Sequence, residues 1–372
     1  MVAQQGQVYL VTGGCGFLGR HLVKMLAERE EGISEIRVFD VQLDRELERW
    51  STDTVTVTMI QGDVTDRDQL IRATAGVDVI MHVASIVDVF NSIPEATMQK
   101  VNVQGTHHVI EACVANGVRR CVYTSSMEVV GPNSRREHFV RGNEESSYNT
   151  LHEVPYTRTK AAAEKVILEA NGIQVSGGGK LASCALRPMG IYGEGCALLR
   201  GIYGKALKLG GRLFRLGPRT VQSGRVYVGN VAWMHLLAAR GLKEKPGLVG
   251  GQVYYCSDGS PDRSHMDFNM ELLGPCGVRL IGQKRPVLPY IFIYMLAALA
   301  ELLQLVLRPF CTFAPYLNRY TLALGSTTFT VCTDKATRHF SYRPLYSWEQ
   351  SKDRTVRWLL SLPQADQEAK RC

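Results

Sequence analysis

The 372-residue sequence has no run of five or six like charges, no internal repeat and no low-complexity tract. Blocks of like charge are typical of arms that bind nucleic acid, so we expect no nucleic-acid partner. Its ten cysteines are sparse and form neither a CxxC motif nor a zinc-like cluster with histidine. This excludes a disulfide-rich scaffold and predicts no metal site. The net charge of +8 is mild.

The N-terminus has no basic segment followed by an apolar one, so we expect no secretory signal. With the cysteine spacing, this predicts reduced thiols in a protein that faces the cytosol. Apolar residues make up 45% of the chain and charged residues 21%, proportions that indicate a folded protein rather than a disordered or fibrous one.

Short apolar segments alternate with amphipathic ones along the first half of the chain. Strand patterns lie at 8–12, 36–40, 55–61, 77–83, 120–125 and 182–186, and helix patterns at 21–30, 66–74, 97–116 and 156–170. Such alternation is typical of βαβ units. It predicts an α/β fold with a Rossmann-type, doubly wound parallel sheet.

A glycine-rich turn follows the first strand pattern. It reads TGGCGFLG over residues 12–19, with glycines three residues apart. Glycines at this place let the backbone approach a pyrophosphate at a helix N-terminus. We therefore expect a dinucleotide to bind along this turn, at Gly13, Gly14, Cys15, Gly16, Phe17, Leu18 and Gly19.

Two carboxylates follow the next two strand patterns. Asp40 lies 21 residues after Gly19. A carboxylate there can hold both ribose hydroxyls of an adenosine and repel a 2′-phosphate, which favours NAD over NADP. Asp63 and Val64 follow the third strand in the sequence GDV, where the aspartate can reach the adenine amino group.

Hydride chemistry is indicated by Tyr156 and Lys160, which share one helix face, and by Ser126, 30 residues before the tyrosine. All three are expected at the carboxyl edge of the sheet, where α/β folds bind ligands. The Lys160 ammonium and a nicotinamide would lower the pKa of the phenol, so that Tyr156 takes the alcohol proton as hydride leaves. Ser126 would hold the developing carbonyl oxygen.

Together these motifs resemble the extended short-chain dehydrogenase/reductase family. SSMEVVGPN (125–133), LRPMGIYGEG (186–195), GRVYVGNV (224–231) and PLYSWE (344–349) resemble its 3β-hydroxysteroid dehydrogenase/Δ5–Δ4 isomerase branch. NVAWMHLLAAR (230–240) and NMELLGPCG (269–277) are more similar to the bile-acid subgroup, which acts on 27-carbon, 7α-hydroxylated sterols, than to the steroid-hormone enzymes.

The resemblance implies NAD-dependent oxidation of a 3β-hydroxyl group, a shift of the ring double bond from Δ5 to Δ4, and attachment to the endoplasmic-reticulum membrane with the catalytic domain facing the cytosol. It assigns Tyr156, Lys160 and Ser126 to catalysis. We also expect cofactor contacts from Tyr156, from Lys160, which would bind the nicotinamide ribose, and from Pro188. Met189 departs from the branch, where threonine is common. The acid and base of the isomerase step are left unassigned, as is the oligomeric state, a homodimer included.

One late segment is unusually apolar. Pro286–Leu307 is 22 residues long and contains a single charge, Glu301, and a single amide, Gln304. Its length suits a bilayer crossing, but strand-like 327–333 and helix-like 347–362 follow it. If this tail packs on the catalytic domain, a helix lying in one leaflet avoids separating the two. We expect contact with membrane lipid and leave the topology open.

We accordingly divide the chain into a Rossmann domain (1–192), a smaller substrate lobe (193–285), a membrane-associated helix (286–309) and a C-terminal segment that returns to the lobe (310–372). Three alternatives to a bile-acid sterol enzyme are kept. They are a steroid-hormone enzyme, a soluble sugar-nucleotide epimerase or reductase, and a non-catalytic NAD-binding sensor, which should have lost the tyrosine or the lysine.

Overall fold

A seven-stranded parallel sheet forms the centre of the molecule in the computed structural model, which describes residues 6–307, 310 and 314–363. Its spatial order is β11-β7-β5-β4-β1-β2-β3, and every neighbouring pair is parallel. The strands are β1 (Gln7–Thr12), β2 (Ile33–Asp40), β3 (Thr56–Gln61), β4 (Val79–His82), β5 (Arg120–Thr124), β7 (Ala182–Pro188) and β11 (Val253–Cys256). The six expected strands are confirmed.

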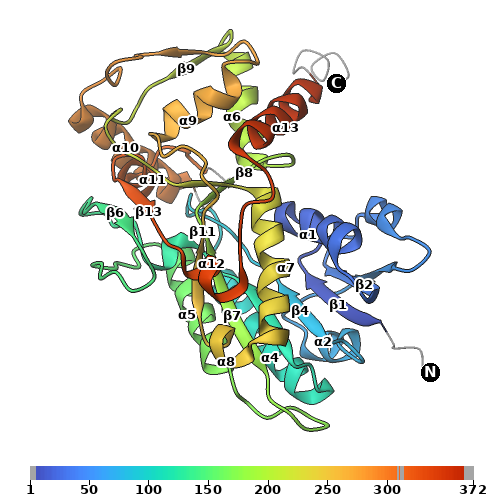
Figure 1. The fold of residues 1–372 in the computed structure, drawn as a ribbon. Coiled ribbons are helices and arrows are strands. Elements are labelled where there is room, and N and C mark those ends of the chain that lie inside the picture. Colours follow the sequence, from blue (N-terminus) through green and yellow to red (C-terminus); the bar gives the residue numbers. More distant parts are fainter. Residues whose placement is uncertain (1–5, 308–309, 311–313, 364–372) are drawn as a thin grey trace.

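Helices cover both faces of the sheet (Figure 1). On one face lie α1 (Phe17–Arg29) and α7 (Val228–Glu244), and on the other α2 (Arg67–Ala73), α4 (Gly105–Asn116) and α5 (Pro155–Glu169). The sequence of β1 is continuously apolar because its side chains enter two cores. Tyr9 and Val11 join one core, and Leu10 joins the other. Successive side chains point to opposite faces, and here both faces are buried.

The helix expected at 97–116 is helical throughout but not uniform. It consists of α3 (Glu95–Met98), a π-helical section η2 (Gln99–Gln104) and α4. Within the π-helical section, the Asn102 amide donates to the Ile86 carbonyl at 3.0 Å, and its oxygen accepts from the Ile86 N–H at 2.8 Å. The wider turn thus brings a side chain to the segment that leaves β4.

The second half of the chain does not form a separate lobe throughout. Strand β11 extends the main sheet beside β7, and α7 packs against α1. Residues 228–256 therefore belong to the sheet domain, which differs from the assignment of all of 193–285 to a substrate lobe. The sequence signal was weak because β11 is an edge strand of four residues.

The remaining elements build the lobe and its connections. The helices are η1 (Arg45–Trp50), η3 (Met127–Val129), α6 (Ala197–Lys208), α8 (Pro246–Val249), α9 (His265–Leu273), α10 (Tyr290–Leu307), α11 (Arg319–Leu324), α12 (Lys335–Phe340) and α13 (Trp348–Ser361). The small parallel pairs are β10 (Arg225–Tyr227) with β8 (Gly190–Tyr192), β12 (Arg279–Ile281) with β9 (Arg212–Phe214), and β13 (Phe329–Val331) with β6 (Phe139–Gly142).

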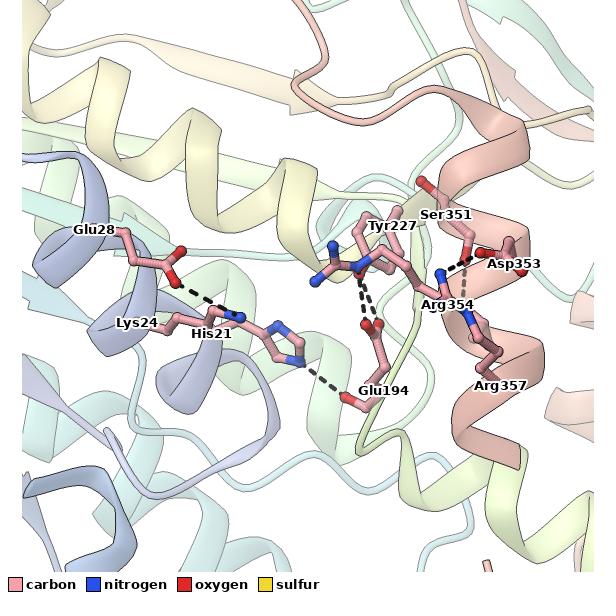
Figure 2. A network of polar contacts seen from close by, with 10 residues as sticks. His21, Lys24, Glu28, Glu194, Tyr227, Ser351, Asp353, Arg354 and Arg357 are labelled. Atoms are coloured by element: carbon pink, nitrogen blue, oxygen red, sulfur yellow. Dashed lines mark hydrogen bonds and ion pairs between the residues drawn. The ribbon is translucent and has the colours of Figure 1, made fainter. Parts of the chain in front are cut away.

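The C-terminal helix α13 is tied back to the first helix by a polar network. Figure 2 shows Glu194, on the turn after β8, beside Tyr227 and Arg354. The Tyr227 hydroxyl donates to one carboxylate oxygen at 2.7 Å, and Arg354 Nε donates to the other at 3.1 Å. His21 of α1 bonds the Glu194 backbone carbonyl at 2.8 Å. The tail thus contacts both the lobe and the sheet domain.

Helix α10 is apolar and mostly exposed. It is long and apolar enough to cross a membrane, with a mean hydropathy of 2.0, and only 11% of its residues are buried. The expected segments 286–309 and 310–372 are described only in part, because residues 308–309, 311–313 and 364–372 lie outside the described residues.

Candidate active site

The glycine turn joins β1 to α1 and lies against the backbone that follows β4. Gly13 has a φ of +68°, and a Cβ atom there would lie 2.7 Å from the backbone of Ala84. A Cβ atom on Gly19 would lie 2.6 Å from the Gly14 Cα, so the helix could not pack so close to the turn. The expected residues Gly13, Gly14, Cys15, Gly16, Phe17, Leu18 and Gly19 all lie in this turn and the first turn of α1.

Asp40 ends the neighbouring strand and contacts the glycine turn directly. Its Oδ2 accepts a 3.0 Å hydrogen bond from the Cys15 N–H, and its Oδ1 accepts from Gln42 at 3.2 Å. A carboxylate is therefore fixed beside a turn with exposed backbone at a helix N-terminus. This combination fits the ribose and pyrophosphate of a dinucleotide.

Asp63 and Val64 differ in their position. Asp63 lies just beyond β3, and its Oδ1 accepts from the Thr65 N–H at 2.8 Å. Val64 is buried (6% exposed) and packs against Gly105 at the start of α4. The side chain of Val64 is therefore a core residue, and any cofactor contact at this position would come from its backbone.

Ser126 and Tyr156 meet at the carboxyl end of β5. Ser126 caps η3, where its hydroxyl accepts from the Glu128 N–H at 3.2 Å. Tyr156 lies in the first turn of α5, directly after Pro155, a residue suited to this position because its nitrogen needs no acceptor. Burial and the Glu128 carboxylate raise the pKa of Tyr156, and a hydrogen bond with Ser126 lowers it.

Lys160 is buried one helical turn after Tyr156. Its ammonium donates a 2.6 Å hydrogen bond to the Thr124 carbonyl and lies 4.3 Å from the centroid of the Tyr123 ring. Burial lowers the pKa of Lys160 to about 7, opposed by the Glu164 carboxylate. We expected Lys160 to lower the pKa of Tyr156, but it is directed to the end of β5, and Ser126 is the group that does so.

Glu164 follows Lys160 by one further turn and forms a buried ion pair with Arg187. Arg187 donates to both carboxylate oxygens, at 2.9 and 2.6 Å, and the Ser125 hydroxyl donates at 2.6 Å. Arg187 is thereby an anchor between α5 and β7. Pro188 and Met189, which follow it, are buried beside β11, and Met189 donates its N–H to the Cys256 carbonyl at 3.3 Å.

Sequence reasoning missed an acidic group beside the phenol. Glu128 lies two residues after Ser126, and burial raises the pKa of its carboxyl to about 7. The Tyr320 hydroxyl of α11 donates to Glu128 Oε2 at 2.8 Å and lowers that pKa. Glu128 was visible in the motif SSMEVVGPN, whereas nothing near Tyr320 in the sequence pointed to the site.

The arrangement provides a phenol, a hydroxyl, an ammonium and a carboxyl group of near-neutral pKa at one edge of a sheet. Such a site can hold a hydroxyl group of a substrate while the phenol takes its proton, and the carboxyl group can transfer a second proton nearby. No group of three or more histidine, cysteine, aspartate or glutamate side chains that could hold a metal ion occurs within the described part of the chain.

Comparison with known proteins gives a consistent picture. Residues 10–289 match the 3-beta hydroxysteroid dehydrogenase/isomerase family. The chain is 58% identical to 3 beta-hydroxysteroid dehydrogenase type 7 of Homo sapiens over 95% of this chain and 96% of the relative. It is 55% identical to the Mus musculus protein of the same name, with the same coverage.

Solved structures share the fold at lower identity. A UDP-galactose 4-epimerase aligns with a TM-score of 0.67 and 19% identity, over 95% of this chain and 98% of that one. MoeE5 in complex with UDP-glucuronic acid and NAD aligns with a TM-score of 0.64 and 23% identity, over 95% and 98%. At these identities the likeness extends to the α/β architecture alone.

Proposed function

Because the chain belongs to the 3-beta hydroxysteroid dehydrogenase/isomerase family, we propose that it oxidises the 3β-hydroxyl of a Δ5 sterol with NAD and then moves the double bond to Δ4. The observation that carries this proposal is the grouping of Ser126, Tyr156 and Lys160 with the buried carboxyl group of Glu128. An oxidation alone needs the first three residues. The fourth gives the same site a group for a second proton transfer.

NAD is the favoured cofactor because Asp40 presents a carboxylate beside the glycine turn, where a 2′-phosphate would be repelled. NAD held by the glycine turn and Asp40 would supply the acceptor for the hydride that leaves C3 of the sterol. Asp63 and Pro188 remain proposed contacts for the adenine and nicotinamide ends, respectively. A structural neighbour of this fold, MoeE5, is a complex with NAD.

In the oxidation, Tyr156 takes the proton of the 3β-hydroxyl group while Ser126 donates a hydrogen bond to the oxygen that becomes the carbonyl. The raised pKa of Tyr156 means that forming its phenolate, which accepts this proton, costs free energy. Lys160 binds the nicotinamide ribose from its buried position one turn after Tyr156, where its ammonium also donates to the Thr124 carbonyl.

In the isomerisation, we assign the proton transfer to Glu128. Its carboxylate takes a proton from C4 of the 3-keto-Δ5 product, the electron pair shifts toward the carbonyl, and the same proton is returned at C6. A carboxyl group with a pKa of about 7 is suited to both halves of this exchange, because it is readily charged and readily discharged at neutral pH.

The sterol class follows from the relatives named type 7 and from the bile-acid motifs, so we propose 7α-hydroxylated, 27-carbon sterols as substrates. The exposed apolar helix α10 supports association with a membrane, which we propose to be that of the endoplasmic reticulum, with the catalytic domain on the cytosolic side. A membrane location gives such an enzyme access to substrates that are nearly insoluble in water.

The proposal is tested by incubating detergent-solubilised protein with NAD and a 7α-hydroxylated 3β-hydroxy-Δ5 sterol while NADH is followed. We expect NADH with this sterol and little with UDP-sugars. Activity on pregnenolone-type steroids alone would keep the family reaction and overturn the bile-acid substrate. Activity on none of these compounds would contradict the proposed reaction.

A further inference from the structure

Helix α10 contacts the rest of the protein along one face over its whole length. Ile293 and Ala297 are buried (1% and 0% exposed), and Glu301 and Gln304 are partly buried. These residues are spaced by four, four and three positions, which places them on one stripe of the helix. The stripe begins in the first turn of α10 and ends in its last.

The two polar residues of the stripe are directed at the catalytic domain. Gln304 Nε2 donates to the carbonyls of Phe90 and Asn91, each at 3.1 Å. Glu301 forms an ion pair with Arg319 of α11 at 2.7 Å and accepts from the Arg319 N–H at 2.6 Å. The Glu301 carboxylate and the Gln304 amide therefore both have hydrogen-bond partners within the protein.

The opposite face of α10 has no charged side chain and is apolar except for the hydroxyl group of Tyr294. Its side chains are between 37% and 66% exposed, and they are Ile291, Phe292, Tyr294, Met295, Leu296, Leu299, Leu302, Leu303, Leu305 and Val306. A contiguous apolar surface of this kind marks a contact with lipid or with another protein.

We propose that α10 lies flat in a single leaflet of an anionic membrane, parallel to its plane, and does not cross the bilayer. Its length does not decide between the two orientations, since 18 residues at 1.5 Å per residue span about 27 Å, close to the hydrocarbon thickness. The protein contacts do decide. A crossing helix would carry the Glu301–Arg319 pair and the carbonyls of Phe90 and Asn91 into hydrocarbon.

Exposed apolar side chains also occur elsewhere in the lobe that Figure 1 shows to contain α10 and β9. Phe214 and Ile281 are Cα partners in the β9–β12 pair and are 42% and 41% exposed. Arg212 and Arg279, another Cα pair of these strands, are exposed, as are Lys284 and Arg285. The β9–β12 pair thus presents exposed apolar and basic side chains together.

Charge favours lipid as the occupant over a second copy of the chain. Residues 274–300 contain no acidic side chain, whereas they include Arg279, Lys284 and Arg285. Basic residues beside an apolar helix are attracted to anionic headgroups, but they would face like charge in a symmetric pair of this surface. The inference rests on the membrane association proposed above.

Topology is tested with the full chain in endoplasmic-reticulum microsomes, with an Asn-x-Thr glycosylation acceptor added at the N-terminus in one protein and at the C-terminus in another. A flat helix leaves both ends on the cytosolic side, so we expect glycosylation at neither end in membrane-bound protein. A crossing helix gives glycosylation at one end and overturns the proposal. The same acceptor behind a cleavable secretory signal confirms that it can be modified.

The lipid-facing surface is tested with Leu299→Glu/Leu302→Glu and, as a matched control, Leu360→Glu, an exposed leucine of α13 (58% exposed). On vesicles of 70% phosphatidylcholine and 30% phosphatidylserine, we expect binding to weaken at least about tenfold in the double variant and to be unchanged in the control. Because all three leucines are exposed, the variants should retain their melting temperature.

Unchanged vesicle binding of the double variant would overturn the assigned face. Wild-type protein that binds no vesicle, but forms a dimer disrupted by the same substitutions, would assign the face to a second copy. Sterol oxidation measured in detergent reports on the proposed reaction alone. Membrane orientation and catalysis can therefore fail separately.

Discussion

The Tyr320 hydroxyl donates a 2.8 Å hydrogen bond to Glu128 Oε2. The two residues lie 192 positions apart, yet this bond ties α11 to the turn that carries Ser126. Burial raises the pKa of Glu128 to about 7, and the bond from Tyr320 opposes that rise. Two opposing effects thus set the pKa of a carboxyl group beside the Tyr156 phenol to about 7.

Replacing Tyr320 by phenylalanine removes the group that lowers the pKa of Glu128, so that pKa should rise. If the carboxylate takes the C4 proton, isomerisation is lost as the pH falls through this pKa. The acidic limb of isomerisation in Tyr320→Phe should therefore move to higher pH by about half a unit or more. Formation of the conjugated enone from a 3-keto-Δ5 sterol measures it. The matched control is Tyr342→Phe, whose hydroxyl bonds the Ser257 carbonyl; equal profiles for all three proteins would exclude Glu128 as the base.

We expect the buried Lys160 ammonium to lower the free energy of unfolding at neutral pH and to be required for activity. Burial lowers its pKa to about 7, so between pH 7 and 10.5 the unfolded chain binds more protons at this residue than the folded one. Its contribution to stability therefore increases as the pH rises over that range. Lys160→Met should raise the melting temperature at pH 7, with a smaller gain at pH 9, and reduce kcat/KM at least about 100-fold.

The control for that experiment is Lys165→Met, an exposed lysine on the same helix with 75% of its side chain accessible. It should leave both kcat/KM and the pH dependence of melting unchanged. A Lys160→Met protein that melts lower than wild type at pH 7 would show that the bond to Thr124 outweighs the cost of burying the ammonium.

Asp40 should determine the choice of dinucleotide. Asp40→Ala removes the negative charge that repels a 2′-phosphate and the acceptor of the Cys15 N–H. We expect the KM for NAD to rise about tenfold and the ratio of NADP to NAD activity to rise by a similar factor. Asp53→Ala, at an exposed position, is the control. An unaltered cofactor ratio would place the adenosine ribose elsewhere.

The Glu164–Arg187 pair should behave as a buried ion pair, since the two side chains are only 5% and 13% exposed. Arg187→Met leaves the Glu164 carboxylate without its main partner and should destabilise the fold by about 3–5 kcal/mol. Adding Glu164→Gln should restore a large part of this loss. Urea unfolding of the two single variants and the double variant measures the coupling free energy. If the losses in free energy of unfolding are strictly additive, Glu164 and Arg187 do not stabilise each other.

Much of the fold could be predicted because its signals are local. The strand that leads into the glycine turn is continuously apolar from Val8 to Val11, as a parallel sheet buried on both faces requires, and the strand that ends at Asp40 has the apolar pair Val38 and Phe39 just before it. The turn residues sit next to one another in the sequence. The placement of Gly13 through Gly19 at the start of α1 therefore followed from pattern alone.

Other features depend on contacts between distant segments. Strand β11 has four residues, and only its pairing with β7 identifies it as part of the main sheet. Tyr320 reaches Glu128 because the fold brings α11 to η3, and no spacing in the sequence indicates that contact. The π-helical section at Gln99–Gln104 likewise has a helical pattern in sequence. The catalytic roles of Ser126, Tyr156 and Lys160 stay predictions.

The most direct measurement follows NADH and the conjugated enone together, with a 7α-hydroxylated 3β-hydroxy-Δ5 sterol, in wild type, Tyr156→Phe and Glu128→Gln. We predict both products for wild type, neither for Tyr156→Phe, and NADH with little enone for Glu128→Gln. Enone formed at the wild-type rate by Glu128→Gln would contradict the assignment of the second proton transfer. NADH formed at the wild-type rate by Tyr156→Phe would contradict the oxidation mechanism itself.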